Sequence, residues 1–167
     1  MGGREFRCAL RWYLGLPVTG RPAGAPCPKC DVPMDVFGDH AVCCPNNGPI
    51  RRHRAVQQAL YRILQAHGVA SQMEVAVAGK EHPADVWLPS WDVAGGTAID
   101  LTIVHPLQLG GDWVHADRVV EAAEQAKRTK YQTLCDDLGI LLVPLGMSTW
   151  TGYGPAGAAF MKRLLAS

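Results

Sequence analysis

The sequence predicts an α/β fold with a mixed central sheet flanked by helices, in the order α-β-β-β-α-β, and a small cysteine-rich insert ahead of it. Two long helical patterns enclose three short strand-like runs, and a fourth apolar run follows the second helix. Four of the six cysteines lie inside one stretch of eighteen residues, which is part of a proline-rich segment. A chain of 167 residues is long enough to bury one substantial core.

The first half of the chain predicts two helices and three strands. Apolar residues at helical spacing indicate a short helix over 4–14 and a long one over 50–67, and Gly15 and Gly68 follow them as stop signals. Three runs rich in β-branched residues are separated by Gly, Pro and Asp, which is typical of a three-stranded meander. These runs span 71–78, 84–89 and 97–104.

The second half predicts a crossover unit. A long helix over 114–138 leads into a continuous apolar run over 139–146, which is typical of a buried strand, and a closing helix follows over 155–166. A strand, a helix and a further strand in one sheet form a right-handed parallel connection. The fourth strand is therefore expected to lie parallel to the third.

Composition excludes several classes of protein. With 48% apolar and 19% charged residues, the chain is neither disordered nor a coiled coil. Its apolar runs are far shorter than the ~20 residues of a membrane span, so we expect a soluble, intracellular protein without a membrane partner. The net charge is +1, so a nucleic-acid partner has to be bound by locally clustered charge.

The cysteine-rich insert has the spacing of a metal site. Cys27 and Cys30 are followed by His40 and Cys44 in the pattern C-x2-C-x9-H-x3-C. Three thiolates and an imidazole form a closed tetrahedral site for structural Zn2+, which orders a segment that has little apolar surface of its own. Cys43 is the alternative fourth ligand, and the competing interpretation is four buried thiols without a metal.

The two remaining cysteines have a simpler interpretation. Cys8 and Cys135 each lie within an apolar helical pattern. A free thiol in such a position behaves as a small hydrophobic side chain. We therefore expect both in the core.

The first turn of the long helix is basic. Arg51, Arg52 and Arg54 stand where the positive end of the helix dipole disfavours cations, which favours an anion-binding role. Together with the backbone N–H groups they are candidates for contacts to nucleic-acid phosphates. The alternative is a solvated basic turn. His53 lies on the apolar face and is expected to be packed and hydrogen-bonded.

Two aspartates are candidates for a second metal site. Asp85 opens the second strand, and Asp100 lies inside the apolar third strand, where a carboxylate is unfavourable unless it is paired or bound to a metal. If these strands are antiparallel neighbours, the two carboxylates meet at one end of the sheet and offer oxygen ligands to Mg2+. Each aspartate alone is equally well explained as a turn or edge residue.

A lysine stands in the apolar stripe of the second long helix. At roughly 100° per residue, the stripe residues lie within about 40° of Lys127, whereas Lys130 and Glu124 lie about 60° away on either shoulder. The stripe contains Val120, Ala123, Tyr131, Leu134 and Leu138. An ammonium directed at two aspartates and a metal suits phosphoryl chemistry. The alternative is a lysine that reaches past its neighbours to solvent.

These motifs resemble a known family. HPAD (82–85), AIDLT (98–102) and AKRTKY (126–131), in this order of elements, are similar to the PD-(D/E)XK nuclease superfamily. From Cys27 to the C-terminus, about five-sixths of the chain, the sequence resembles the restriction-like endonuclease domain of R2-type non-LTR retrotransposon proteins. CPKC with GDHAVCC, RRHRAV and GILLVPL complete the match.

The sequence pattern and the resemblance together give a domain plan, and the resemblance implies a mechanism. Residues 1–24 would be a leading helix and linker, 25–49 the zinc segment and 50–167 the nuclease core. Asp85, Asp100 and the Leu101 carbonyl would hold Mg2+ or Mn2+. Lys127 or Lys130 would orient the attacking water, and the product would carry a 3′-hydroxyl. Glu74 in the first strand is either a further ligand or an exposed carboxylate.

The sequence departs from the superfamily pattern at two positions. Thr102 stands where a strand lysine is common, so the lysine would have moved to the helix, as in the retrotransposon group. Ala84 separates the proline from Asp85. The expected partner is DNA, with RNA or a polymerase domain of a parent protein as further partners, and the expected location is the nucleus. The alternative functions are a non-catalytic nucleic-acid-binding module and a junction-resolving nuclease.

Overall fold

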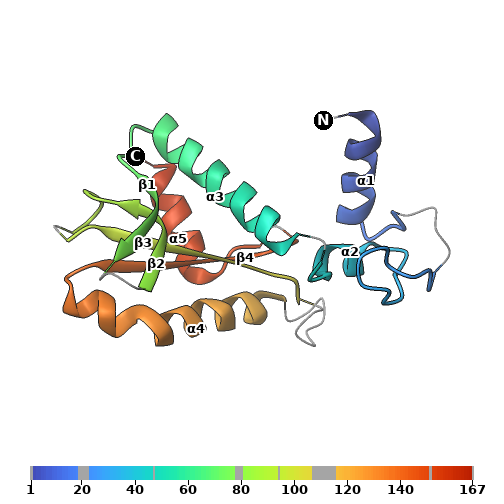
Figure 1. The fold of residues 1–167 in the computed structure, drawn as a ribbon. Coiled ribbons are helices and arrows are strands. Elements are labelled where there is room, and N and C mark those ends of the chain that lie inside the picture. Colours follow the sequence, from blue (N-terminus) through green and yellow to red (C-terminus); the bar gives the residue numbers. More distant parts are fainter. Residues whose placement is uncertain are drawn as a thin grey trace. The chain divides into compact units, whose positions relative to one another are not determined.

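The protein contains two compact units, residues 1–51 and 52–167 (Figure 1). The structure is a computed structural model that describes residues 2–18, 23–46, 48–77, 81–93, 95–106, 116–150 and 152–166. Within these residues, no helix combines the length and the hydropathy that a bilayer crossing requires. The unit boundary falls in the first turn of α3 (Pro49–Ala66).

The second unit is built on a mixed four-stranded sheet of order β1-β2-β3-β4. β1 (Gln72–Val77), β2 (Glu81–Leu88) and β3 (Thr97–Val104) form an antiparallel meander. β4 (Leu141–Ser148) runs parallel to β3, in register from Thr97↔Leu141 to Val104↔Ser148. The predicted α/β class, the meander and the parallel fourth strand are confirmed. The predicted positions 78, 114 and 115 lie outside the described residues.

Helices cover both faces of the sheet. α4 (Ala116–Asp137) crosses over one face between β3 and β4, while α3 and α5 (Pro155–Leu164) lie against the other (Figure 1). β3 divides its side chains between the two cores, because neighbouring strand residues point to opposite faces: Ile99 and Leu101 join the cluster under α3 and α5, and Ala98 joins the cluster under α4. Full burial of one such leucine contributes about 1.5–3 kcal/mol.

Glycines terminate the two long helices: Gly68 does so as predicted, whereas the sequence pattern predicts that Gly139 begins the following strand. Gly68 follows α3 with a φ of 70°, and Gly139 follows α4 with a φ of 65°, a left-handed conformation that favours glycine. Behind each glycine the next N–H returns to the last turn of the helix, from Val69 to the Leu64 carbonyl at 2.9 Å and from Ile140 to the Cys135 carbonyl at 2.8 Å. These bonds satisfy helix carbonyls that would otherwise lack partners.

A buried glutamate joins α4 to the end of the sheet. Glu124 is 4% exposed, and its carboxylate accepts hydrogen bonds from the backbone N–H groups of Gly146, Ala156 and Gly157 at 2.9–3.0 Å. Two of these donors belong to the first turn of α5, where N–H groups lack helical partners and the dipole favours a negative charge. Glu124 is therefore a structural carboxylate that holds α4, β4 and α5 together.

The first unit contains α1 (Gly3–Tyr13) and α2 (Asp39–Cys43). The leading helix is confirmed, but none of its residues is buried, so the expected core position of Cys8 is wrong and its thiol is exposed. The apolar stripe that suggested burial needs a partner surface, and the residues of the first unit that the structure describes do not bury this thiol. Cys135 in α4 is buried, as expected.

Candidate functional site

The four predicted zinc ligands converge on one point. The ligand atoms of Cys27, Cys30, His40 and Cys44 all lie within 4.8 Å of one another. Cys27 Sγ lies 3.9 Å from Cys44 Sγ, which is 3.5 Å from Cys30 Sγ, and Cys30 Sγ is 3.3 Å from His40 Nε2. Tetrahedral zinc with Zn–S bonds of about 2.3 Å places its ligands roughly 3.3–3.8 Å apart. The group could therefore hold a structural Zn2+.

Local structure explains how this convergence arises. Cys27 and Cys30 lie on a tight turn in which the Cys27 N–H donates to the Val32 carbonyl and the Asp31 N–H returns to the Cys27 carbonyl, both at 2.9 Å. His40 and Cys44 lie one helical turn apart at α2, where the Cys44 N–H donates to the His40 carbonyl at 2.7 Å. The predicted Cys44, rather than Cys43, joins the group.

Two further features prepare this segment for a metal. The Asp35 carboxylate accepts hydrogen bonds from the N–H groups of Gly38, Asp39 and His40 at the start of α2. Burial opposes these bonds, but they hold the pKa of Asp35 below its usual value. The Lys29 N–H lowers the pKa of Cys27 to about 6 against the effect of burial, with a smaller contribution from His40. A thiolate, the form that binds metals, is therefore favoured at Cys27.

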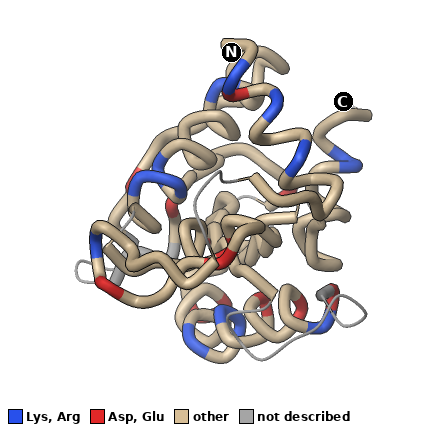
Figure 2. The backbone as a smooth tube through the Cα atoms, turned by 90° about the vertical axis from the view of Figure 1, so that its right-hand side faces the viewer, with Lys and Arg blue, Asp and Glu red and all other residues tan. Residues whose placement is uncertain are grey.

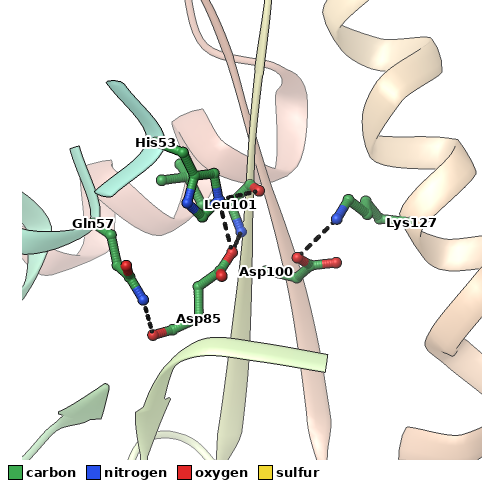
Figure 3. A network of polar contacts seen from close by, with 6 residues as sticks. All are labelled: His53, Gln57, Asp85, Asp100, Leu101 and Lys127. Carbon is green, nitrogen blue, oxygen red and sulfur yellow. Dashed lines mark hydrogen bonds and ion pairs between the residues drawn. The ribbon is translucent and has the colours of Figure 1, made fainter. Parts of the chain in front are cut away.

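The second candidate site lies at the end of the β2–β3 pairing (Figure 3). These strands pair from Leu88↔Thr97 to Val86↔Ile99. Beyond this point the Leu101 N–H donates to Asp85 Oδ2 at 2.7 Å. The Asp85 carboxylate thus takes a backbone donor that continued strand pairing would use, and it lies between the two strands as they separate.

Two residues of α3 hold Asp85 in this position. His53 Nε2 lies 3.2 Å from Asp85 Oδ2 and 3.1 Å from the Leu101 carbonyl; because both oxygens are acceptors, this nitrogen carries the proton. One turn later, Gln57 Nε2 donates to the Asp85 carbonyl at 2.8 Å, and Gln57 is 2% exposed. His53 is packed and hydrogen-bonded, as expected, but its partner is a predicted site residue.

These contacts determine the charge states of the pair. Burial raises the pKa of Asp85, but the bonds from His53 and Leu101 outweigh it and keep that pKa below its usual value. The bond to Asp85 in turn raises the pKa of His53, against the opposing effect of burial. Asp85 is therefore an ionised carboxylate at neutral pH.

Asp100 is in a different environment. It is 4% exposed, and Lys127 Nζ of α4 donates to its Oδ1 at 2.9 Å (Figure 3). Its second oxygen, Oδ2, is buried and has no hydrogen-bond partner among the described residues. Burial raises the pKa of Asp100 to about 6, and the neighbouring Asp85 adds to this effect, although Lys127 opposes it. A buried carboxylate oxygen without a donor is costly unless a ligand occupies it.

The other predicted residues lie in several different environments. Lys130 is exposed, with its ammonium 4.5 Å from the centre of the Tyr131 ring. Glu74 is exposed in β1, with a φ of 53°. Arg51 and Arg54 are exposed on the first turns of α3, and Arg52 is half-buried.

Sequence reasoning missed the roles of His53, Gln57 and Glu124. One available signal is the polar pair His53 and Gln57, spaced i, i+4 on the buried side of an amphipathic helix, since buried polar side chains require partners. Which partners they meet depends on the position of α3 on the sheet, and the sequence alone does not give that position.

A scan against protein-family models finds no match to this chain, and a search of curated proteins finds none. What is established is an α/β unit with a mixed four-stranded sheet and an upstream Cys3His group.

Proposed function

We propose that this chain is a metal-dependent DNA endonuclease domain that nicks a phosphodiester and leaves a 3′-hydroxyl, like the retrotransposon domain that its motifs resemble. The observation that carries the proposal is the unpartnered, buried Oδ2 of Asp100, beside Asp85 and an ion-paired Lys127. A purely structural carboxylate would have its oxygens satisfied, as those of Glu124 are.

The residues present fit a hard divalent cation. The carboxylates of Asp85 and Asp100 and the Leu101 carbonyl would hold it, since Mg2+ and Mn2+ prefer oxygen ligands. When bound, such an ion supplies Lewis-acid stabilisation of the phosphoryl oxygens and a water activated for attack. The unpartnered Asp100 oxygen is the donor that gains most from the ion.

The side chains of the chain itself provide positioning and charge. His53 and Gln57 fix the carboxylate and the backbone of Asp85 from one face of the sheet. Lys127 reaches Asp100 from the other face and brings a cation close to where a scissile phosphate would lie. Its ammonium would orient the attacking water and stabilise charge that develops on phosphate oxygens.

DNA binding is assigned to the first turns of α3. Arg51, Arg52 and Arg54 provide guanidinium groups at a helix N-terminus, which favours phosphate through both charge and free N–H groups. His53 lies between two of these arginines and bonds to Asp85, so a strand held here would be near the carboxylates. With a net charge of +1, affinity would depend on this local cluster and decrease with added salt.

Plasmid nicking tests the proposal. Wild-type protein with Mg2+ or Mn2+ should convert supercoiled plasmid to open circles, and Asp85→Asn or Asp100→Asn should reduce the rate by about 10²–10³-fold. DNA binding measured in Ca2+ should persist in both variants. Asp92→Asn is the matched control, because Asp92 pairs with Arg163 instead and its φ of 63° tolerates asparagine.

A non-catalytic nucleic-acid-binding module is the second candidate. In the metal-free arrangement, His53 donates to both Asp85 Oδ2 and the Leu101 carbonyl, so two of the three oxygen ligands are already hydrogen-bonded within the protein. Wild-type protein that binds DNA but produces no nicks with either cation would establish this alternative and exclude the nuclease.

We also infer that the Cys3His group binds one structural zinc per chain. Its four protein ligands complete a tetrahedron and leave no position for a substrate, so the ion would order the segment and take no part in cleavage. Metal analysis should find about one zinc per chain, and chelation should unfold the segment, as monitored by amide exchange. Zinc-free purified protein, with Cys27→Ser equal to wild type in stability, would exclude this inference.

A further inference from the structure

An apolar groove lies between α3 and α5, on the sheet face opposite α4. Its volume is about 330 Å³. Leu60, Leu101 and Leu145 form a buried floor, and Met161 of α5 lines one wall. All of these residues belong to the second unit. The groove does not include the Asp100 and Lys127 pair, which lies on the α4 side.

The α3 wall of the groove remains open to solvent. Val56, Ala59 and Ile63 follow one another at i, i+3 and i+7 and form an apolar line along the helix. Ile63 is 38% exposed, and Tyr153 is 40% exposed at the groove edge. An apolar line of this spacing beside a floor of leucines matches the way in which grooves bind an amphipathic helix.

The two helices beside the groove are basic. α3 carries Arg51, Arg52, Arg54 and Arg62, α5 carries Lys162 and Arg163, and neither helix contains an Asp or Glu, although Arg163 pairs with Asp92. By helix geometry, Arg62 lies beside Ile63 and one turn after Ala59. Helix α4, at the bottom of Figure 2, instead carries charges of both signs.

We propose that this groove binds an acidic amphipathic helix of a partner protein. Aliphatic residues of the partner at i, i+3 or i+4, and i+7 would fill the groove, and its Asp and Glu side chains would pair with Arg62, which is exposed. Charge complementarity selects this occupant, because the floor is apolar and the charged side chains of the two flanking helices are all basic, with Arg163 already paired to Asp92. The proposal is independent of the proposed nuclease activity.

Two other occupants fit the groove less well. A nucleic-acid strand would need aromatic surfaces on which to stack bases, and apart from Tyr153 the lining is aliphatic. The chain's own α1 is amphipathic, but it carries Arg4, Arg7 and Arg11 against Glu5, so it is basic like α3 and α5. Each of these two alternative occupants predicts a distinct result in the experiments below.

Peptide selection tests the proposal. The zinc-loaded 167-residue chain is used to select from a library of random 16-residue peptides, and the affinities of enriched peptides are measured by fluorescence anisotropy. We expect aliphatic residues at helical spacing flanked by Asp or Glu. Ile63→Asp should weaken peptide binding at least tenfold. Leu138→Asp is the matched control, at a 45% exposed leucine that directly follows α4, and should leave the affinity within twofold of wild type.

A charge reversal provides the second comparison. Arg62→Glu should weaken binding about five- to tenfold and reduce its salt dependence, whereas Arg118→Glu on α4 should change neither. Circular dichroism and urea unfolding verify folding, and Ala59→Glu, at an exposed position, replaces Ile63→Asp if that variant unfolds.

Several results would overturn the proposal. Enriched peptides that lack acidic residues, or that bind Ile63→Asp as well as wild type, would exclude an acidic helix in this groove. Competition by a peptide of residues 3–14 would assign the groove to the chain's own helix. A dimer in sedimentation that Ile63→Asp dissociates would assign it to a second copy. If wild type binds a fluorescent oligo-dT and Ile63→Asp loses that binding, the groove would be assigned to single-stranded DNA.

Discussion

Glu124 and Asp100 are both 4% exposed carboxylates packed between α4 and the sheet, but their oxygens have different partners. Both oxygens of Glu124 are used, in three hydrogen bonds from backbone N–H groups. Asp100 has a single ion pair with Lys127, and its Oδ2 has no partner among the described residues. Burial is the same in the two regions, so burial does not distinguish their roles.

The hydrogen-bond partners of the carboxylate oxygens do distinguish the roles of Glu124 and Asp100. A carboxylate that accepts several fixed N–H donors stabilises the fold as an anion. A carboxylate with one unpartnered oxygen and a pKa raised to about 6 weakens the fold when it is ionised, and such a group persists when a ligand offsets that loss. The comparison therefore assigns Glu124 to structure and makes Asp100 the centre of the candidate site.

The largest expected effect on stability is at Glu124. Glu124→Ala removes three charge-assisted bonds and leaves buried N–H groups unsatisfied, at Gly146 and at the start of α5, so it should lower the free energy of unfolding by about 3–5 kcal/mol. Urea denaturation followed by circular dichroism measures this loss. A loss below about 1 kcal/mol would contradict the structural assignment of Glu124.

Asp100→Asn should show the opposite sign and depend on pH. Because the folded pKa of Asp100 is raised, its contribution to stability is fully present below about pH 4 and is lost as the pH rises through about 6. In Mg2+-free buffer the variant should therefore gain stability relative to wild type between pH 5 and pH 7.5, by about 1–3 kcal/mol. A difference that is constant with pH would show that Asp100 does not titrate in this range.

Lys127→Met tests the partner of Asp100. The apolar stripe alone predicts a neutral or stabilising change, but the ion pair changes that expectation, since the substitution leaves a buried carboxylate alone. We expect a loss of about 1–2 kcal/mol at pH 7.5 that disappears near pH 5. Lys127→Met combined with Asp100→Asn should restore stability, as measured in a double-mutant cycle. Additive effects of the two substitutions on the free energy of unfolding would show that the two side chains do not interact.

The smallest expected effect is at Gln57. Gln57→Leu keeps the volume but removes the donor to the Asp85 carbonyl, so it should cost about 1 kcal/mol of stability. If the site is a nuclease, the turnover rate should fall about tenfold with DNA affinity unchanged, because Gln57 positions Asp85 and does not contact DNA. Equal losses in affinity and rate would indicate a general structural role instead.

Much of this fold could be predicted from local pattern. The helical stripe of α3, the β-branched runs of the meander and the terminal glycines each satisfy a local rule, so type and order of elements follow from the sequence. The Cys3His group could also be predicted, because its four ligands lie within eighteen residues of one another in the sequence and can therefore meet without depending on the rest of the fold. The core position of Cys8 could not, because burial of α1 depends on which surface covers it.

The carboxylate site could be predicted only in part. Antiparallel pairing predicts that Asp85 and Asp100 lie near each other, and helix periodicity places Lys127 over them. The hydrogen bonds of His53, Gln57 and Glu124 depend on how α3, α4 and α5 lie against the sheet, which is a tertiary property. The pairing of β2 with β3 ends at Asp85 because the Asp85 carboxylate, and not a backbone carbonyl, accepts the Leu101 N–H. Periodicity in the sequence does not reveal this exchange.

The most direct test of the Asp100 assignment is cation binding measured without any reaction. With zinc saturating and constant, Mg2+ or Mn2+ at about 100 times its Kd should stabilise the wild-type second unit by about 2.7 kcal/mol, and Asp92→Asn should respond equally. Asp100→Asn should lose this stabilisation, because the unpartnered oxygen that the ion would bind is replaced. A wild type that neither cation stabilises, or an Asp100→Asn variant that is stabilised as strongly, would contradict the account.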